Sequence, residues 1–407
     1  MRKVSKEFAS LNNFGYKITR RVFKRKFIMW FFTDEEKELQ RVCRDFARNE
    51  LAPFAEKHDT DETFNMDAFR KMGEIGVLGI TASPDFGGAG MGCTAATLVM
   101  EEFGKACASS TLSYLAHAIL TINNIENNAS PEQKEKYLPK LISGEHIGCM
   151  GMSEPEYGSD ALGMQTKAEN KGDHYLLNGT KMWITNAQYA DIAYVYARTG
   201  KNKKDISTFI LEKDKGHFSF GKPIHKMGMR ASPTGELIFD NAKIPPQNRV
   251  GEENQSTYHM LKNLDIERIT ISGISVGIAQ ACLDQCVKYA GERKQFGKTI
   301  GSFQMIQRMI AEMAAEVGMM RSFIYQVAYE FDQGNHGPVQ AAKVKLAIPK
   351  LATKIALDAI QVHGGYGYSR EFPVERMMRD NKLMEIGAGT NEIMILIIAK
   401  NLLSITE

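Results

Sequence analysis

The stretch Tyr258-His-Met-Leu-Lys-Asn-Leu-Asp-Ile-Glu-Arg-Ile-Thr-Ile271 reads as the opening turns of a long helix that runs to about Tyr289. Its leucine and isoleucine residues recur at helical spacing, which marks a buried face. Within this pattern lie Asp265, Glu267 and Arg268. Two adjacent turns of a mostly apolar helix therefore carry two carboxylates and a guanidinium.

A carboxylate in apolar surroundings is harder to ionise, so its pKa rises and it becomes a usable proton acceptor near neutral pH. Glu267 is on this basis a candidate general base. The alternative is a solvated charged edge in which the glutamate pairs with the neighbouring arginine, because structural ion pairs also occur in such patterns. The stretch alone leaves both interpretations open.

The chain has 407 residues, of which 43% are hydrophobic and 24% charged, as is usual for a globular protein of two or three packed units. Its net charge of +3 argues neither for nor against a nucleic-acid partner, and we expect none. Residues 1–27 hold nine basic side chains and one acidic one, which leaves −5 on the rest. A basic leader of this kind, residues 1–32, resembles a mitochondrial presequence. The alternatives are a disordered basic tail, or an upstream extension with Met29 as the working start.

No apolar run reaches the length of a membrane span; the run Phe27–Phe32 has six residues and is followed by acidic side chains. The six cysteines show no Cys-x-x-Cys spacing, and Cys282 and Cys286, one helical turn apart, are interpreted as core residues. This usage is typical of a reducing compartment and predicts no metal site.

Helix signals dominate the first part of the chain. Thr33 followed by three acidic residues is a typical N-cap, and Ser130-Pro-Glu-Gln133 is a capping box with proline at the first helical position. The glycines at 87–92 have the wrong spacing for a dinucleotide fingerprint and are interpreted as a turn between packed helices. We expect helices near residues 34–51, from 67 onward, and at 94–105, 111–127 and 131–141.

Short alternating runs separated by turn signals extend from Gly144 to about Pro246 and indicate a small β domain. In the segment Tyr175–Thr185, the pair Asn178-Gly179 predicts a hairpin turn between two strands. Helical periodicity then returns, at residues 255–289, 303–332, 338–363 and 391–403. The order predicts an α+β multidomain fold: basic leader 1–32, N-terminal helical domain 33–143, small β-barrel-like domain 144–250 and C-terminal four-helix bundle 251–407.

Two motifs open the β domain and precede the last helix. The first is Gly151-Met-Ser-Glu-Pro-Glu-Tyr-Gly-Ser-Asp160, continuing to Gly163, and the second runs from Gln361-Val-His-Gly-Gly365 to Asp380. Three shorter motifs complete the set: Trp183-Ile-Thr185, Arg293-Lys-Gln-Phe-Gly297 and Gly387-Ala-Gly-Thr-Asn-Glu392. Each motif is weak evidence alone, since glycines near helix ends are usually caps and a lone tryptophan is usually a core residue. Together, on a helix–β–helix chain, they resemble the acyl-CoA dehydrogenase family, from about residue 33 to the C-terminus.

The resemblance implies non-covalently bound FAD and an acyl-CoA thioester substrate. A carboxylate takes the α-proton of the substrate while a hydride passes from the β-carbon to the flavin. The resemblance also implies a homotetramer built as a dimer of dimers, with electron-transfer flavoprotein as the partner that takes the electrons. With the basic leader it implies the mitochondrial matrix, or the cytoplasm if the leader is not a presequence.

Cofactor residues are carried over from the matching motifs. Backbone N–H groups and hydroxyls suit the polar edge of a flavin, and an indole can pack on its apolar side. An arginine fork or a helix start suits a pyrophosphate. The implied flavin contacts are Met150, Met152, Ser153, Gly158, Ser159, Trp183, Ile184 and Thr185. The rest of the cofactor, partly that of a neighbouring subunit, falls to Arg293, Gln304, Gln361, Val362, His363, Gly364, Gly365, Thr390, Asn391 and Glu392.

Substrate contacts are carried over in the same way. Tyr157 departs from the family, which prefers a small residue at this turn position, and so leaves the neighbouring Ser159 contact open. The implied CoA-side contacts are Ser159, Lys203, Lys204 and Tyr258. Those around the acyl group are Asp265, Ile266, Glu267, Arg268, Gly387, Ala388 and Gly389.

One position separates branches of the family. Most members carry the catalytic glutamate just before the Gly-Thr of the last helix, where this chain has Ala388. In the branch that acts on branched short chains the base stands in Asp-Leu-Glu-Arg, matched here by Asp265-Ile-Glu267-Arg268. The resemblance therefore selects Glu267 as the base. Gly387, where straight-chain members hold a bulky aromatic residue, leaves room for a branched acyl group.

The function expected from the resemblance is oxidation of a short branched acyl-CoA, first of all isovaleryl-CoA to 3-methylcrotonyl-CoA in leucine catabolism. Three alternatives stay open. The enzyme could act on another straight or 2-methyl-branched acyl chain, it could be an oxidase, or the chain could be a catalytically silent member that binds FAD or acyl-CoA.

Overall fold

The computed structural model describes residues 32–335 and 337–404. The predicted presequence lies outside these residues, apart from residue 32. The chain divides into residues 1–38 and a much larger compact unit, residues 39–407. Helix α2 (Asp34–Phe46) begins in the first unit, where Thr33 and Glu36 cap it reciprocally: the Glu36 N–H donates to Thr33 Oγ1 at 3.1 Å and the Thr33 N–H to Glu36 Oε2 at 2.8 Å. The N-cap prediction is confirmed.

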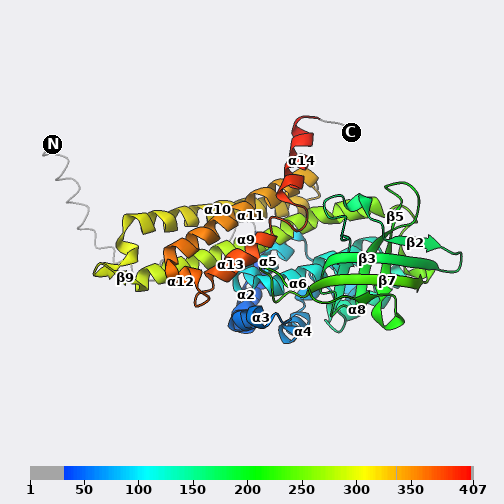
Figure 1. Cartoon of the computed structure of the whole chain (residues 1–407), viewed down its shortest axis with the longest axis horizontal. Helices are drawn as coiled ribbons and strands as arrows, with labels where there is room; N and C mark the ends of the chain where they lie inside the picture. Colours follow the sequence, from blue (N-terminus) through cyan, green and yellow to red (C-terminus); the bar gives the residue numbers. More distant parts are fainter. Residues whose placement is uncertain (1–31, 336, 405–407) are drawn as a thin grey trace. The chain divides into compact units, whose positions relative to one another are not determined.

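Short helices fill the first third of the larger unit (Figure 1). The single helix predicted at 111–127 is interrupted by a π turn, Ala118–Ile122. The capping box at Ser130 is confirmed, with both reciprocal bonds to Gln133 present. The helices here are α3 (Ala55–Asp61), α4 (Met66–Glu74), α5 (Cys93–Ala106), α6 (Ala108–His117), α7 (Asn123–Asn128) and α8 (Pro131–Ile142), and a π turn, Ala47–Leu51, follows α2.

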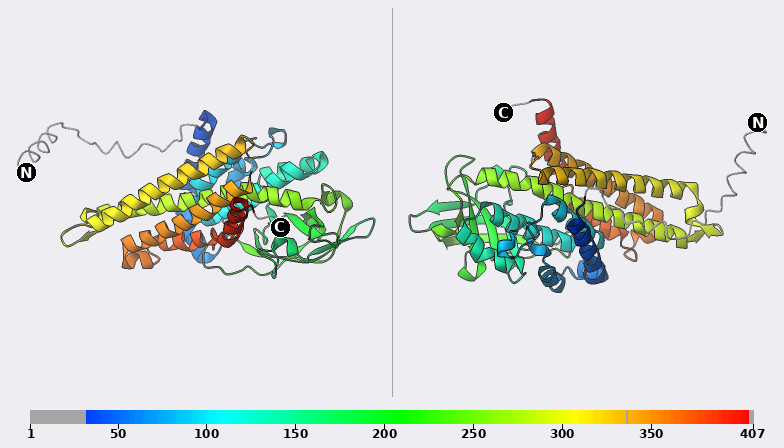
Figure 2. Two further views of the ribbon diagram at one scale, coloured as in Figure 1. Left: turned by 90° about the horizontal axis from the view of Figure 1, so that it is seen from above. Right: turned by 180° about the vertical axis from the view of Figure 1, so that it is seen from behind.

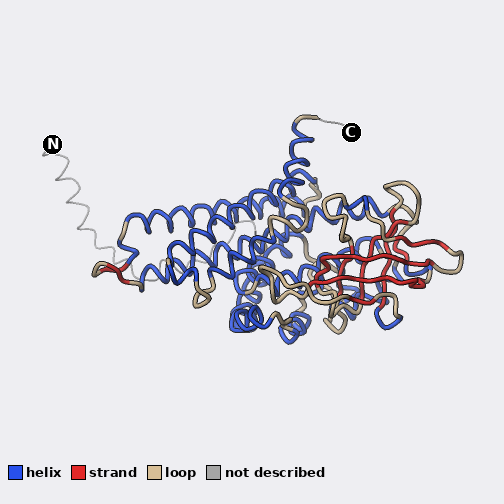
Figure 3. Tube along the Cα trace, viewed as in Figure 1, coloured by secondary structure: helices blue, strands red, loops and turns tan. Residues whose placement is uncertain are grey.

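The strands form one eight-stranded sheet in the order β6-β7-β3-β2-β4-β5-β8, with β1 paired to β4 in parallel (Figure 3). Strand β4 is buried over its first six residues because one face lines the sheet core and the other packs toward the helices. The strands are β1 (Gly148–Gly151), β2 (Lys167–Asn170), β3 (Tyr175–Thr185), β4 (Ile192–Arg198), β5 (Ile206–Glu212), β6 (Ser219–Phe220), β7 (Thr234–Ile244) and β8 (Arg249–Val250).

The hairpin predicted at Asn178-Gly179 is wrong, because β3 runs unbroken from Tyr175 to Thr185. The pair instead forms a β-bulge, where the register of β3 against β7 shifts. Gly179 has a φ of +139°, and a Cβ there would lie 2.7 Å from Thr166 Cα. The Asn178 side chain accepts from the Asn241 N–H of β7 at 2.8 Å. Asn-Gly chemistry thus serves a bulge within the sheet instead of a turn.

The last third of the chain is built on three long helices that pack side by side (Figure 2). They are α9 (Ser256–Glu292), α10 (Gln304–Asp332) and α11 (Pro338–His363). A small hairpin of β9 (Lys294–Gln295) and β10 (Lys298–Thr299) joins the first two. Helices α12 (Gly365–Tyr368), α13 (Val374–Leu383) and α14 (Asn391–Leu402) complete the chain.

Helix α9 lies at the centre of this arrangement. It contacts α5, α10 and α11, and α5 comes so close that a Cβ on Gly277 would lie 2.4 Å from the Glu101 carbonyl oxygen. In the described part of the chain, α9 is the one helix long and apolar enough to cross a membrane, but nearly all of that stretch is buried inside the protein. It has the burial of a core helix.

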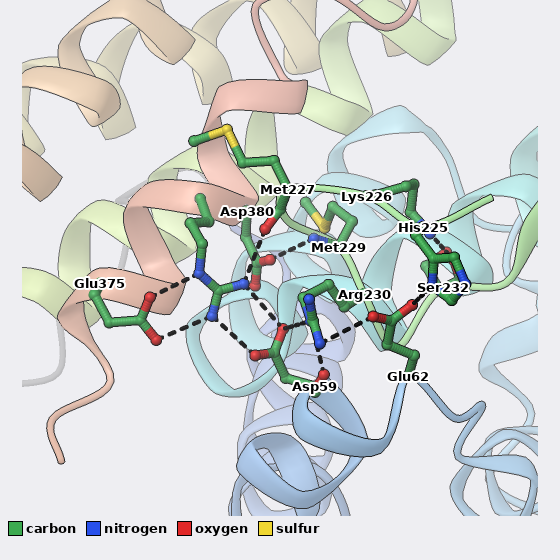
Figure 4. Close-up of polar contacts among 11 residues, drawn as sticks. Asp59, Glu62, His225, Lys226, Met227, Met229, Arg230, Ser232, Glu375 and Asp380 are labelled. Carbon is green, nitrogen blue, oxygen red and sulfur yellow. Dashed lines mark hydrogen bonds and ion pairs between the residues drawn. The ribbon is translucent and has the colours of Figure 1, made fainter. Parts of the chain in front are cut away.

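A partly buried ionic network joins segments that are distant in sequence (Figure 4). Arg379 on α13 binds Asp59 on α3 through both terminal nitrogens, at 2.8 and 3.3 Å. The same guanidinium binds Glu375, one helical turn earlier, at 2.7 and 2.9 Å. Arg230, from the loop before β7, reaches Glu62 at 2.9 Å. The network ties the first helices, the sheet domain and α13 together.

Asp380 belongs to the same junction and closes the second sequence motif. Its carboxylate accepts from the Met229 N–H at 2.5 Å, and the side chain is buried. Burial raises the pKa of Asp380 to about 6. Met229 has a φ of +52°, so this bond holds an unusual backbone conformation. The motif residue Asp380 therefore has a structural contact.

Candidate active site

Glu267 lies on α9 with 6% of its surface exposed. Its Oε2 atom has no hydrogen-bond partner among the described residues. Burial raises the pKa of Glu267 to about 7, and the positive charges of Arg268 and Lys345 act in the opposite direction. A carboxylate of this kind can exist in both protonation states near neutral pH, as a general base requires.

The other carboxylate of the stretch is already engaged. Asp265 accepts from Arg268 Nη1 at 3.3 Å. Burial raises the pKa of Asp265 to about 6, against the charge of that arginine. Of the two candidates, Asp265 is paired, and the unpartnered oxygen belongs to Glu267. The two carboxylates therefore differ in their contacts, and Glu267 stays the candidate base.

The turn between α13 and α14 packs against this part of α9. Arg268 Nε donates to the Ala388 carbonyl oxygen at 3.4 Å. Ala388 has a φ of +55° and Gly389 a φ of +94°. A Cβ built on Gly387 would lie 3.6 Å from the Leu383 carbonyl oxygen, an ordinary van der Waals contact, so a side chain can begin there without a clash. The helix with Glu267 and the turn with Ala388 are therefore neighbours.

Two buried charged side chains, Lys181 and Glu154, hold the predicted flavin loop, residues 150–159. This contact was not predicted from the sequence. Lys181 on β3 donates to the Met152 carbonyl oxygen at 3.0 Å and pairs with Glu154 at 2.9 Å. Glu154 also accepts from the backbone N–H groups of Gln165 and Thr166. Burial lowers the pKa of Lys181 to about 8. No local signal marks a strand lysine as buried, so only the three-dimensional structure reveals this support.

Trp183 stands at a second bulge of β3, where the register against β7 shifts between Lys181 and Ile184. Its φ is +65°, and 57% of its surface is exposed. The neighbours differ: Ile184 is buried, and Thr185 pairs with Thr234 of β7. The bulge turns the indole out of the sheet core, where an aromatic ring of a ligand can meet it.

The predicted CoA-side residues come from three separate segments and meet on one surface. Lys203 pairs with Asp160, the residue after Ser159, at 2.9 Å. The Thr257 hydroxyl, beside Tyr258, donates to the Lys204 carbonyl oxygen at 3.0 Å. The structure therefore brings the loop of the first motif, the loop before β5 and the start of α9 together.

Tyr157, the departure noted in the first motif, is half-buried and lies against Gly163 in the same loop. A Cβ on Gly163 would come within 2.6 Å of Tyr157 Cδ1. The glycine thus makes room for the ring. Ser159 itself is exposed.

A cavity of about 620 Å³ lies at the far end of α9 and collects predicted cofactor residues. Its lining includes Arg293 together with Val362, His363, Gly364 and Gly365. The Arg293 guanidinium lies 5.4 Å from the centre of the Tyr366 ring. Gln304 and Gln361 are exposed and are not part of this lining.

His363 is the best-buried polar group of that cavity. Its Nδ1 bonds the Ala359 carbonyl oxygen at 2.8 Å, and its ring stacks on Tyr289 at 4.3 Å. Its Nε2 has no partner among the described residues. Side chains built on Gly364 and Gly365 would meet no atom within 4 Å, so open space adjoins the backbone. These features are compatible with the predicted contact between this segment and a phosphate-bearing ligand.

The start of α14 holds the remaining predicted cofactor residues. The Thr390 hydroxyl accepts from the Ile393 N–H at 3.3 Å as the N-cap, and Glu392 occupies the first turn. Asn391 donates to Glu385 at 3.1 Å, while its Oδ1 has no partner among the described residues. Ile266, in contrast, lines a separate cavity of about 310 Å³.

Family models match nearly the whole described chain. They are those of the acyl-CoA dehydrogenase N-terminal domain over residues 33–145, the middle domain over 149–242 and the C-terminal domain over 257–403. A mitochondrial isovaleryl-CoA dehydrogenase of Pongo abelii is 44% identical over 374 residues, which cover 90% of this chain and 88% of that relative. The chain belongs to the acyl-CoA dehydrogenase family.

Solved structures of related proteins agree. Butyryl-CoA dehydrogenase from Megasphaera elsdenii is 34% identical, with a TM-score of 0.89 over 92% of this chain and all of that chain. The FAD complex of PigA is 29% identical, with a TM-score of 0.88 over 92% and 99% of the two chains. The acyl-CoA dehydrogenase fold predicted from the sequence is confirmed. The chain is accordingly an FAD-dependent oxidoreductase with acyl-CoA dehydrogenase activity.

Proposed function

We propose that this acyl-CoA dehydrogenase oxidises short branched acyl-CoA thioesters, with isovaleryl-CoA as the preferred substrate and 3-methylcrotonyl-CoA as the product in leucine catabolism. The observation that carries the proposal is the position of the buried Glu267, whose Oε2 has no hydrogen-bond partner among the described residues. It lies on the helix that Arg268 joins to the turn holding Gly387 and Ala388. The relative that is 44% identical supports the choice of acyl chain.

Glu267 is the proposed base. Its free Oε2 accepts the proton from the α-carbon of the thioester, and burial makes the protonated product state accessible. Arg268 is positioned to hold the turn beside the acyl group, because it donates to the Ala388 carbonyl oxygen. Bound FAD supplies the hydride acceptor for the β-carbon.

Gly387 is the proposed source of specificity for branched chains. The atoms nearest to a Cβ at this position would be those of Leu383, at 3.6 Å or more, whereas the glycine leaves that volume without a side chain. A hydrophobic pocket discriminates between chains that differ by one methyl group by only about 1–3 kcal/mol, so even this local space shifts substrate choice measurably.

The residues described above fit FAD in two sets. The loop 150–159, Trp183 and the start of α14 suit the flavin and adjoining groups of the cofactor held by the same chain. Arg293 and the glycines after His363 suit a pyrophosphate and its neighbours. Glu267 and Glu292 are 25 residues apart on α9, so the end of this helix, which directly precedes Arg293, lies about 38 Å from Glu267 along the helix axis.

One dinucleotide does not span that distance, so we infer that the second set serves the FAD of a neighbouring subunit. A homotetramer built as a dimer of dimers satisfies this requirement.

We also propose electron-transfer flavoprotein as the acceptor of the electrons, because acyl-CoA dehydrogenation leaves a reduced flavin to be reoxidised. The mitochondrial relative and the basic leader support a matrix location.

An anaerobic titration of the purified holoprotein tests the substrate. Isovaleryl-CoA, 2-methylbutyryl-CoA, butyryl-CoA and a long-chain acyl-CoA are mixed with it in turn, and flavin bleaching is followed with and without electron-transfer flavoprotein. We expect the fastest bleaching with isovaleryl-CoA and turnover with the flavoprotein. Faster bleaching with another thioester would contradict the substrate. If none of the four thioesters bleaches the flavin, the chain is a catalytically silent member. Rapid turnover with oxygen as the sole electron acceptor would favour an oxidase.

A further inference from the structure

Lys345 on α11 is a lysine whose side chain has no solvent exposure. A buried ammonium group is unfavourable unless hydrogen bonds and opposite charges compensate it. Its Nζ donates to the carbonyl oxygen of Met384 at 2.5 Å and to that of Gly389 at 3.3 Å. Across the described residues, no carboxylate forms an ion pair with it. Backbone carbonyls, not a salt bridge, are its direct partners.

The two carbonyls lie at opposite ends of one short segment. Met384 is the C-cap of α13, and Gly389 directly precedes Thr390, the N-cap of α14. One ammonium group therefore ties together both ends of the turn that contains Ala388. Carbonyls at a helix C-terminus attract cations, which favours this placement. From α9, Arg268 donates to the Ala388 carbonyl oxygen in the middle of the same turn.

The same two cations act on Glu267. Arg268 comes from its own helix and Lys345 from α11, and both favour the ionised carboxylate. Tyr196, on β4 of the sheet, has a buried hydroxyl with no partner among the described residues. Burial raises the pKa of Tyr196, and the Glu267 charge raises it further. Glu385 acts electrostatically on Lys345 from the turn. Lys345 thus both holds the turn and acts electrostatically on the proposed base.

We propose that Lys345 is a positioning residue for the dehydrogenation: it fixes the Met384–Gly389 turn and keeps a positive charge near Glu267, so that the base is ionised beside the acyl group at neutral pH. The inference rests on the proposed role of Glu267. Burial lowers the pKa of Lys345 to about 8, and the Glu267 charge opposes that shift. The two groups therefore support each other's charged forms.

The test compares two substitutions in the flavin-loaded enzyme. Lys345→Met removes the charge and the hydrogen bonds, whereas Lys345→Gln removes the charge and keeps an N–H donor. Flavin reduction by isovaleryl-CoA is measured against pH. We expect the acid-side limb of the profile to move up by about one pH unit in both variants, with about tenfold slower reduction on the acid side of that limb. Lys350→Met, the same change at an exposed position of α11, should leave the profile unchanged.

A second readout does not depend on turnover. The protonated Glu267 carboxyl gives an infrared band that is assigned by its loss in Glu267→Gln. Its titration midpoint should rise in Lys345→Met and Lys345→Gln, and Lys345→Arg should return it toward the wild-type midpoint. If Lys345→Met does not fold with FAD, Lys345→Gln carries the comparison alone.

Two results would overturn the inference while leaving the proposed function intact. One is a wild-type profile and band midpoint in Lys345→Gln. The other is an equal loss of rate at every pH, which describes a structural lysine only. Failure of the proposed function has a different signature, namely a wild-type rate in Glu267→Gln whatever the lysine variants do.

Discussion

Arg268 donates from Nε to the carbonyl oxygen of Ala388 at 3.4 Å and so joins the helix that carries Glu267 to the turn before α14. Resemblance to the family places a catalytic glutamate at one or the other of these two positions. Because Arg268 joins the helix that carries Glu267 to the turn that holds Ala388, we expect a base at either position to reach the same acyl group.

The raised pKa of Glu267 predicts an effect on stability. Its folded-state pKa of about 7 exceeds the ordinary value of 4.5, so its contribution is fully present below about pH 4.5 and is lost as the pH rises through about 7. Glu267→Gln should therefore be more stable than wild type at pH 8.5, by up to about 3 kcal/mol, and nearly equal to it at pH 4.5.

Urea unfolding at the two pH values measures the difference. Glu74→Gln, at an exposed position of α4, is the matched control and should change little at either pH. A Glu267→Gln variant that is less stable than wild type at pH 8.5 would show that the carboxylate is held by a favourable contact.

Gly387→Tyr should place a bulky side chain beside the acyl group. A Cβ at this position would lie 3.6 Å from its nearest neighbour, so the backbone accepts the first side-chain atom without a clash. We expect the preference for isovaleryl-CoA over butyryl-CoA, as a ratio of kcat/KM, to fall by about 1–3 kcal/mol. Equal losses on both thioesters would remove Gly387 from the specificity account.

Arg293→Ala should weaken both FAD retention and subunit association, because this guanidinium lines the far cavity with His363. Flavin content and sedimentation velocity report the two effects. Arg293→Lys should restore only part, since an ammonium lacks the planar fork. Arg308→Ala, an exposed arginine paired only locally with Glu312, is the control. A fully flavinated monomer would contradict the shared-site proposal.

The ionic junction of Figure 4 predicts a structural phenotype without a catalytic one. Asp59→Ala leaves the partly buried Arg379 with Glu375 as its remaining bidentate partner and should lower the free energy of unfolding by about 1–3 kcal/mol. Asp214→Ala, in an exposed pair, should cost less than about 1 kcal/mol. The pH profile of flavin reduction should be unchanged; a shifted profile would mean that the junction reaches the active site.

Periodicity predicted the long helices α9, α10, α11 and α14, because each carries a helical pattern of apolar residues; in α11 the pattern continues through Pro349. It missed α13, whose charged composition gives few apolar positions. The Asn178-Gly179 bulge was misread as a turn because the choice depends on Asn241 of a strand far along the chain. Local sequence holds no record of such partners.

The site shows the same division. Glu267 was found because its neighbours match a family pattern, and its burial then proved compatible with a base. Lys181 and Lys345 were not predicted as site residues, because the residues next to a lysine in sequence do not indicate whether its side chain is buried. Their roles follow from backbone carbonyls supplied by the segments at Met152 and Met384.

The most direct measurement of the central claim is the anaerobic rate of flavin reduction in Glu267→Gln. The amide keeps the size and removes the acceptor, so we expect normal flavin and thioester binding with reduction slower by about 10²–10⁴. Adding Ala388→Glu should recover part of the rate, because Arg268 joins the turn that holds Ala388 to the helix of Glu267, although a misplacement of about 1 Å can itself cost on the order of 100-fold. A wild-type rate of flavin reduction in Glu267→Gln alone would show that Glu267 is not the base.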